Sequence, residues 1–240
     1  MKIRSFLLMA IMAMAVSQAF GHAFWIETSP SGKKGQAQEV RIFFGEYADQ
    51  DISPLDKWFS DTKAYSLTLI TPGKKEIKLN SVPGTDHYKA FFTPETDGVY
   101  TIVLQHTVKD VYHGSRLDYH SSAVVQVGQR SGGAAATTNP NSILVHTTPK
   151  ESYKANESIT LQALLDKAPA GSKEVEVVAP NGWGKTLWTD STGSASFTPI
   201  WPGRYMVEVA VTDDKKSGDH NGTPFKRVWR CATYCIEVSE

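Results

Sequence analysis

The chain has 240 residues, with 25 basic and 25 acidic side chains, so its formal net charge at pH 7 is zero. Hydrophobic residues make up 40% of it, which suits a folded core, and the mature chain is long enough for two domains. Because basic residues are neither in excess nor clustered, we expect no nucleic acid and no anionic membrane surface as a partner.

The first 21 residues have the pattern of a secretory signal peptide. Lys2 and Arg4 precede an apolar run over 6–16, and small residues stand at the −3 and −1 positions of a cleavage site after Gly21. The apolar run is shorter than the ~20 residues that a membrane-spanning helix needs. We therefore predict that 1–21 is removed, that the protein is periplasmic, and that the mature chain has no membrane span.

Cleavage at this bond would make His22 the N-terminal residue. It would then carry an α-amine and an imidazole, whose ordinary pKa values of ~7.7–8.0 and ~6.5 allow both to lose a proton near neutral pH. Amine and imidazole nitrogens suit nickel, cobalt, copper and zinc. His22 is therefore the leading candidate metal ligand. The alternative is that signal peptidase selects only the residues before the cut.

The chain contains an internal repeat. The pattern F-T-P-x-x-x-G-x-Y at 92–100 recurs at 197–205, 105 residues later, and a β-rich run follows each copy. Upstream, 66–73 matches 174–181 at an offset of 108 residues. A period of this length indicates a duplicated domain and not a solenoid unit.

Both copies have the sequence features of β-sheet proteins. Runs such as 39–44, 158–164 and 194–197 alternate in polarity and are bounded by turn residues. The Gly-x-Tyr that opens a strand in each copy is typical of a tyrosine corner. We predict an all-β fold of two tandem immunoglobulin-like β-sandwich domains.

The domain boundaries follow from composition. The segment 129–141 is built of small and polar residues and predicts a flexible linker. The N-terminal sandwich, predicted to bind metal, then covers 22–128, and the C-terminal sandwich covers 142–240.

Five of the seven histidines fall in the first domain, and three of them are spaced by seven residues. On one straight strand this odd spacing would place neighbours on opposite faces, but turn residues between them could fold them together. We predict that a divalent nickel, cobalt or copper ion is held by His22 with His113 and His120, and next by His106 or His87. The alternative is that these are ordinary exposed histidines. Oxygen donors that could complete the site are Asp118, Glu27, Glu46 and Tyr119.

The two cysteines, Cys231 and Cys235, lie in a strand-like run over 228–238. Export favours their pairing, but four residues of strand span ~13 Å and a disulfide tolerates ~7 Å between Cα atoms. We expect a local disulfide across a bulge or turn. The alternative is a straight strand with two free thiols.

Motifs of common catalytic sites are absent from the sequence. It has no G-x-S-x-G, no H-E-x-x-H, no P-loop and no dinucleotide fingerprint, so we predict that the protein is not an enzyme. Tryptophans 183, 188 and 201 could stack on sugars or on a partner, or pack within the sandwich.

The opening His22-Ala-Phe-Trp-Ile-Glu, directly after a signal peptide, resembles that of a domain-of-unknown-function family. Further similarity lies in the second half, in P-N-G-W at 180–183, T-D-S-T-G-S-A-S-F at 189–197, W-P-G-R-Y at 201–205 and G-T-P-F at 222–225. Members of this family are often described as periplasmic components of nickel or cobalt uptake. The resemblance implies a metal-linked binding or transport role and assigns a function to His22 alone.

These observations favour a periplasmic protein that captures a transition metal through His22 and passes it to a membrane metal transporter. One alternative is a structural or interaction module that presents loops to an envelope protein and binds no metal. Another is a copper oxidase that uses the same N-terminal histidine to activate oxygen on a polysaccharide.

Overall fold

The computed structural model describes residues 21–128, 141–145 and 153–240. The predicted signal peptide lies outside these residues except for Gly21, and so does the predicted linker except for Asn141. The regular secondary structure of the described chain consists of β-strands and two short 3-10 helices, η1 (Leu55–Lys57) and η2 (Thr62–Ala64). The all-β, sandwich-like prediction is therefore confirmed. Within the described segments, no helix has the length and apolar character needed to cross a bilayer.

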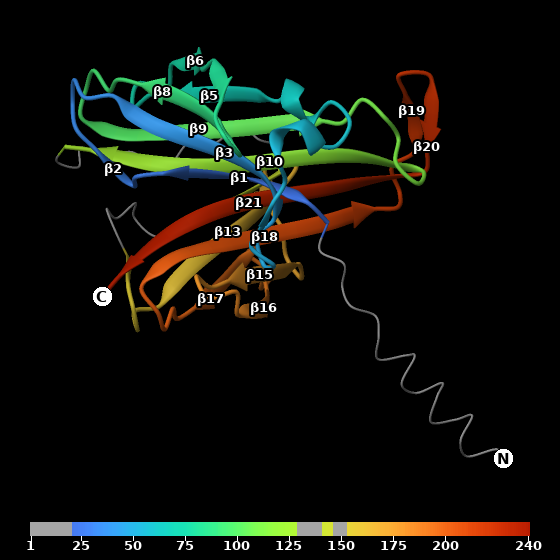
Figure 1. The fold of residues 1–240 in the computed structure, drawn as a ribbon. Coiled ribbons are helices and arrows are strands. Elements are labelled where there is room, and N and C mark those ends of the chain that lie inside the picture. Colours follow the sequence, from blue (N-terminus) through green and yellow to red (C-terminus); the bar gives the residue numbers. More distant parts are fainter. Residues whose placement is uncertain (1–20, 129–140, 146–152) are drawn as a thin grey trace, which may run out of the picture.

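A single large sheet runs through both halves of the molecule (Figure 1). Its main strands, in spatial order, are β16 (Gly184–Trp188), β15 (Glu174–Val178), β18 (Gly203–Asp213), β21 (Arg227–Ser239), β10 (Ser115–Val127), β9 (Gly98–Thr107), β5 (Ser66–Ile70) and β6 (Glu76–Lys78). The short strands β12 (Tyr153–Lys154) and β2 (Ser31–Gly32) pair with β21 and β10. The two halves meet where β10 and β21 pair in parallel, from Ser115 opposite Arg227 to Ser122 opposite Tyr234.

Smaller sheets cover the two halves. The first half has β1 (Ala23–Thr28), β3 (Gln38–Glu46), β8 (Tyr88–Phe92), β7 (Ser81–Pro83) and β4 (Asp51–Ile52). The second half has β11 (Asn141–Val145), β13 (Ile159–Leu165), β14 (Ala168–Pro169) and β17 (Ser194–Phe197). A separate hairpin is formed by β19 (Gly218–His220) and β20 (Thr223–Phe225).

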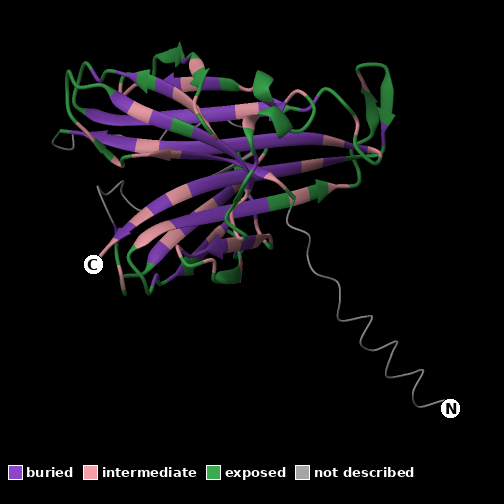
Figure 2. Cartoon of the chain, in the orientation of Figure 1, coloured by how far each residue is buried: buried purple, intermediate pink, exposed green. Residues whose placement is uncertain are grey.

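The two hydrophobic cores lie on opposite faces of the large sheet. Tyr119 of β10 and Cys231 of β21 belong to the first core, whereas Ala232 and Ile236 of β21 belong to the second. Alternate side chains of a strand point to opposite faces, so each central strand serves both cores. Figure 2 shows the resulting buried stretches along β10 and β21. The half-sheet order β10-β9-β5-β6 matches β21-β18-β15-β16, which relates the halves by an approximate two-fold axis along the strands.

Both copies of the repeated motif form the predicted tyrosine corner. The hydroxyl of Tyr100 accepts the backbone N–H groups of the residues four and five positions earlier, at 3.1 and 3.2 Å, and donates to the Thr96 carbonyl at 2.9 Å. The hydroxyl of Tyr205 makes the equivalent bonds at 3.0 and 3.2 Å, and donates to the Trp201 carbonyl at 3.1 Å. The repeat is thus a repeat of local hydrogen bonding as well as of sequence.

The backbone two residues before each corner tyrosine requires a glycine. Gly98 and Gly203 have φ angles of 129° and 126°, a region that side-chain-bearing residues rarely adopt. A Cβ added there would meet the ring of Pro72 at 2.8 Å or of Pro180 at 2.7 Å. The repeated proline and glycine therefore pack directly on each other in both halves.

Replacing Tyr205 with phenylalanine should lower the free energy of unfolding by about 1–2 kcal/mol. The substitution leaves two backbone N–H groups and one carbonyl without the hydroxyl that bonds to them, while the ring keeps its packing on Phe197. Urea unfolding measures the change. Tyr100→Phe is the matched variant in the first half, and a loss confined to one corner would contradict the structural equivalence of the two copies.

The predicted local disulfide is wrong: Cys231 and Cys235 are both free. β21 runs without a break, and its register with β18 is continuous from Ala210 opposite Cys231 to Met206 opposite Cys235. Without a bulge, the extended strand keeps the two Cα atoms ~13 Å apart, beyond the reach of a disulfide. Cys231 packs in the first core, and Cys235 packs against a cluster at the junction of the halves.

Candidate functional site

The strand β1 lies at the junction of the two halves and packs on both. Phe24 and Ile26 are part of the first core, while Trp25 forms a small cluster with Phe43 of β3 and Met206 of β18. The hydroxyl of Thr233 in β21 donates a hydrogen bond of 2.6 Å to the carbonyl of Phe24. The N-terminal strand is therefore fixed against the last strand of the second half.

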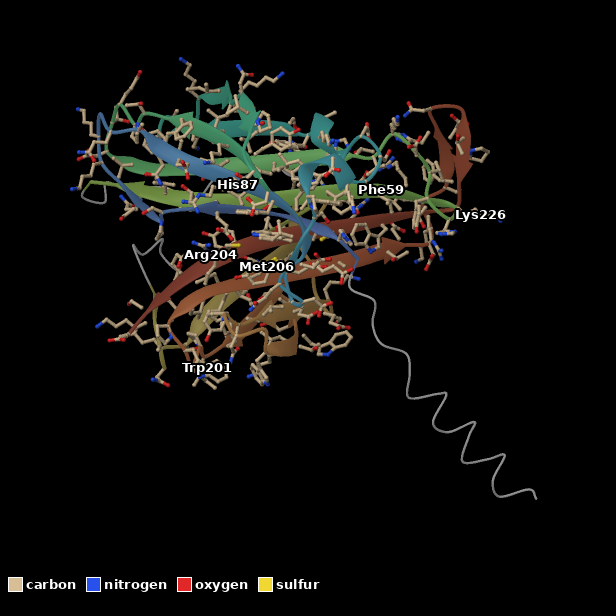
Figure 3. All side chains as sticks on the ribbon, viewed as in Figure 1. Phe59, His87, Trp201, Arg204, Met206 and Lys226 are labelled. Atoms are coloured by element: carbon tan, nitrogen blue, oxygen red, sulfur yellow. The ribbon has the colours of Figure 1, made fainter. Side chains whose placement is uncertain are left out.

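Polar contacts strengthen this junction around Arg204, which Figure 3 labels beside Met206. The Arg204 guanidinium forms an ion pair with Glu27 of β1 and another with Glu237 of β21, the latter at 2.5 Å. The hydroxyl of Tyr47 donates to the Arg204 carbonyl at 3.1 Å. These contacts fix the relative position of the halves, and hence the course of β1.

His22 immediately precedes β1, at the surface end of this junction. The pairing of Ala23 with Gly45 places His22 beside Glu46, and Nδ1 of the imidazole lies 3.4 Å from Oε1 of the carboxylate. The imidazole ring packs on Phe44 at a centroid distance of 5.6 Å. The His22 side chain is 42% exposed and that of Glu46 is 27% exposed, so the pair is open to solvent.

A buried carboxyl group interacts electrostatically with Glu46. Glu208 is 9% exposed, and it stands opposite Glu176 in the neighbouring strand β15. Burial, together with the charges of Glu176 and Glu46, raises the pKa of Glu208 from 4.5 to about 7, although a hydrogen bond from the Cys231 thiol opposes the shift. We call Glu46, Glu176 and Glu208 the junction carboxyls.

Burial also raises the pKa values of Glu176 and of the Cys231 thiol. Burial, and then the charge of Glu174, raise the pKa of Glu176, whose buried Oε2 has no hydrogen-bond partner among the described residues. Burial and the nearby Glu208 raise the pKa of Cys231 well above its ordinary value. The thiol is therefore neutral at physiological pH, and it is a hydrogen-bond donor here, not a nucleophile.

The atoms at His22 suit a transition metal. In a chain that begins at His22, the α-amine and Nδ1 could bind one ion in a six-membered chelate ring, and Nδ1 is the ring atom that faces Glu46. A nitrogen pair with a carboxylate oxygen is a donor set that copper, nickel and cobalt accept. Glu46 was among the oxygen donors that the sequence suggested, and the structure places it beside His22.

The structure does not bring His106 to His22. His106 is buried, and its Nε2 lies 3.1 Å from Oδ1 of Asp61. The rings of Phe24 and Phe44, 4.9 Å apart, stand between the two histidines, because His106 packs on Phe24 and His22 packs on Phe44. An ion at His22 is therefore separated from His106 by two aromatic rings.

His113 and His120 are also apart from each other. His113 is exposed in the turn between β9 and β10, with a φ of 47° and its ring against Tyr112. His120 is buried in β10 opposite Ala232, on the face that serves the second core, whereas His106 faces the first core. The described part of the chain contains no group of three or more His, Cys, Asp or Glu residues placed to hold a metal ion.

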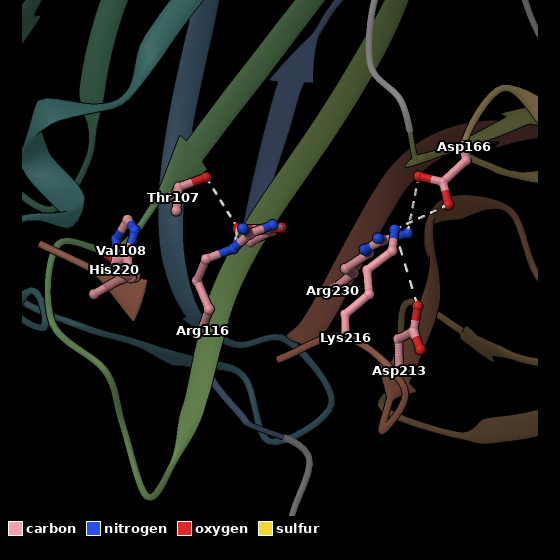
Figure 4. Close-up of polar contacts among 9 residues, drawn as sticks. Thr107, Val108, Arg116, Asp166, Asp213, Lys216, His220 and Arg230 are labelled. Carbon is pink, nitrogen blue, oxygen red and sulfur yellow. Dashed lines mark hydrogen bonds and ion pairs between the residues drawn. The ribbon is translucent and has the colours of Figure 1, made fainter. Parts of the chain in front are cut away.

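Figure 4 shows how the polar residues near the start of β10 are already engaged. The carboxylate of Asp118 accepts hydrogen bonds from Arg116 at 2.8 and 3.2 Å and from the Thr107 hydroxyl at 3.0 Å. Across the sheet, Arg230 pairs with Asp166 at 3.1 Å. Asp118, another oxygen donor that the sequence suggested, is thus committed to structural contacts.

His220 has a structural contact as well. Its Nε2 lies 2.9 Å from the backbone carbonyl of Val108, which requires the tautomer with the proton on Nε2. This bond attaches the β19–β20 hairpin to the turn between β9 and β10.

Sequence reasoning missed the buried carboxyl Glu208, which interacts with Glu46, and its neighbours Glu176 and Cys231. The available signal was a single glutamate inside the apolar run 205–211. A carboxyl at that position must be buried if both faces of the strand are covered, but the second covered face becomes apparent only in the fold.

Comparisons with known proteins give a family but no activity. A family model described as a domain of unknown function, DUF4198, matches residues 19–213. No curated protein matches the chain. Among solved structures, the chain is similar to a DUF4785 family protein from Legionella pneumophila, with 12% sequence identity and a TM-score of 0.32. That match covers 84% of this chain and 56% of the length of the other protein.

Proposed function

The chain belongs to the DUF4198 family, whose function is unknown, and from the geometry before β1 we propose that it is a periplasmic protein that binds a divalent nickel, cobalt or copper ion through His22. The observation that carries the proposal is the 3.4 Å separation between Nδ1 of His22 and Oε1 of Glu46, at an open end of the junction. His22 and Glu46 supply an imidazole and a carboxylate, and cleavage after Gly21 would add the α-amine of His22.

The surroundings of this pair fit a cation. Glu208 lies near Glu46, and its pKa of about 7 means that it is partly protonated at neutral pH. A positive charge at His22 would favour the deprotonated form, so binding would release a proton from Glu208 as well as any from the ligands. Glu208 therefore adds negative charge when the ion is present and holds a proton when it is absent.

The exposure of His22 bears on the role of the bound ion. With 42% of the side chain accessible, an ion there is open to exchange with a partner surface. This supports capture and delivery to a membrane metal transporter, or transfer to another envelope protein, over permanent storage.

One alternative also has support. The described residues hold no ready group of three or more metal-binding side chains, which favours an interaction module of the cell envelope without a metal. The two proposals differ in whether the N-terminal amine matters, so one measurement separates them.

Isothermal titration calorimetry with CuCl₂, NiCl₂ and CoCl₂ compares a chain that begins at His22 with the same chain acetylated at its N-terminus. Acetylation converts the α-amine of His22 into an amide and adds no new amine, so affinity should fall at least about tenfold, or about 1.4 kcal/mol. Glu46→Gln in the His22 chain should also weaken binding. His113→Ala is the matched control and should leave the affinity unchanged.

Equal affinities for the free and the acetylated His22 chain would exclude the amine and overturn the proposal. No binding of any of the three ions by the His22 chain would favour the interaction module. Loss of binding in the His113→Ala variant would instead restore the histidine-rich turn as the site.

A further inference from the structure

The turns that follow β5 and β15 are the same turn in the two halves. The backbone N–H of Thr71 donates to the Lys75 carbonyl at 2.9 Å, and that of Ala179 donates to the Trp183 carbonyl at 2.8 Å. The residue before each acceptor has a positive φ, 62° at Lys74 and 81° at Gly182. Lys75 in the first half is therefore the structural equivalent of Trp183 in the second.

The tyrosine corners supply a second pair of equivalent positions. Tyr100 bonds to both the N–H and the carbonyl of Thr96, and Tyr205 bonds to the same two groups of Trp201. Thr96 is thus the equivalent of Trp201. In each half, the turn that follows β5 or β15 lies against the tyrosine corner, because Pro72 packs on Gly98 and Pro180 packs on Gly203.

In the second half these two positions carry a pair of indoles. The rings of Trp183 and Trp201 meet edge to face with centroids 6.1 Å apart, a favourable aromatic geometry. They are 51% and 38% exposed, so they form the outer cover of that corner. In the first half the equivalent positions, Lys75 and Thr96, carry an amine and a hydroxyl in place of the two indoles.

The first half has an open groove at this position. Its volume is about 470 Å³, and Lys75 and Thr96 are both on its wall. The apolar part of the wall comes from both sheets, and Phe91 beside it is 52% exposed. The main apolar lining residues are Leu69, Ile77, Leu79, Phe92 and Tyr100.

We propose that this groove binds a small planar aromatic compound, whose rings occupy the place that Trp183 and Trp201 fill in the other half. The volume is in the range of small-molecule sites, and the wall combines apolar side chains with a few polar groups. The Lys75 ammonium at the rim could lie over the face of an aromatic ring or pair with an anionic substituent. The site is separate from His22 and does not depend on metal binding.

Titration of the full mature protein with indole, followed by ¹H–¹⁵N NMR, tests the proposal. Saturable shifts are expected at the backbone N–H groups of Thr71, Thr96 and Tyr100. The variant Thr96→Trp, which copies the second half, should fill the groove and weaken indole binding at least about tenfold. Thr96 is exposed, so the substitution leaves the core intact.

Two further variants make the test specific. Lys75→Trp should weaken binding in the same way and serves if Thr96→Trp does not fold. Trp201→Thr changes the equivalent position of the second half and should leave the shifts and affinity at the first-half groove unchanged. Absence of saturable shifts in the unmodified protein would overturn the proposal, and so would an affinity in both tryptophan variants equal to that of the unmodified protein.

Discussion

The variant Trp25→Ala should unfold with a free energy lower by about 3–5 kcal/mol. Trp25 is 2% exposed, stacks on Phe43 with ring centroids 5.3 Å apart, and packs on Met206 of the second half. Its loss leaves a cavity between the sheet of β1 and the large sheet, where neither side can move inward without breaking strand pairing. Equilibrium unfolding in urea measures the change.

The control for this substitution is Trp188→Ala. Trp188 is the same residue type on the edge strand β16, but it is 65% exposed and should change stability by no more than about 0.5 kcal/mol. A loss below about 1 kcal/mol in Trp25→Ala, or equal losses in both variants, would show that Trp25 does not hold the two halves together.

The buried carboxyl of Glu208 should make the protein less stable as pH rises from about 4.5 to about 7. Its pKa is about 7 in the folded protein and 4.5 when unshifted, so in this interval the folded state holds a proton that the unfolded state has lost. Stability falls with pH wherever the folded state binds more protons, here by roughly 3 kcal/mol in total. The full contribution is present below pH 4.5 and is lost above pH 7.

Urea unfolding at pH 5 and pH 8 of the parent and of Glu208→Gln isolates this contribution, because other titrating groups cancel in the difference. The glutamine variant should lose less stability between the two pH values. Glu39→Gln is the control: a hydrogen bond from Arg41 lowers the pKa of Glu39, the opposite direction to Glu208, so removing this carboxyl should not reduce the loss of stability between the two pH values. An identical pH response in the Glu208→Gln variant would place the Glu208 pKa near its ordinary value.

The repeat could be recognised from sequence because the structure that it specifies is local. Each tyrosine corner is closed by hydrogen bonds between residues four or five positions apart, so a nine-residue motif contains all of it. The parallel pairing of β10 with β21 has no such motif, because Ser115 pairs with a residue more than a hundred positions away. Both strands are buried on both faces, as is typical of parallel strands, but that burial becomes apparent only once they are paired in the fold.

The histidine spacing led to the wrong neighbours for a similar reason. His106 and His120 belong to the paired strands β9 and β10, and the register of that pair sends their side chains to opposite faces. A turn alone does not bring two side chains together unless the register also agrees. The neighbour that His22 does have, Glu46, follows from the pairing of β1 with β3, which the sequence did not show.

The position of β1 has a consequence for the order of assembly. Glu46, which pairs with His22, interacts with the charge of Glu208 in β18, and β1 is tied through Phe24 to Thr233 in β21. A nascent chain of which only the first half has been synthesised can pair β1 with β3 but cannot make these contacts with β18 and β21. The pair His22 and Glu46 can therefore form from the first half alone, whereas the hydrogen bond from Thr233 and the buried Glu208 complete its surroundings only when the last strand is in place.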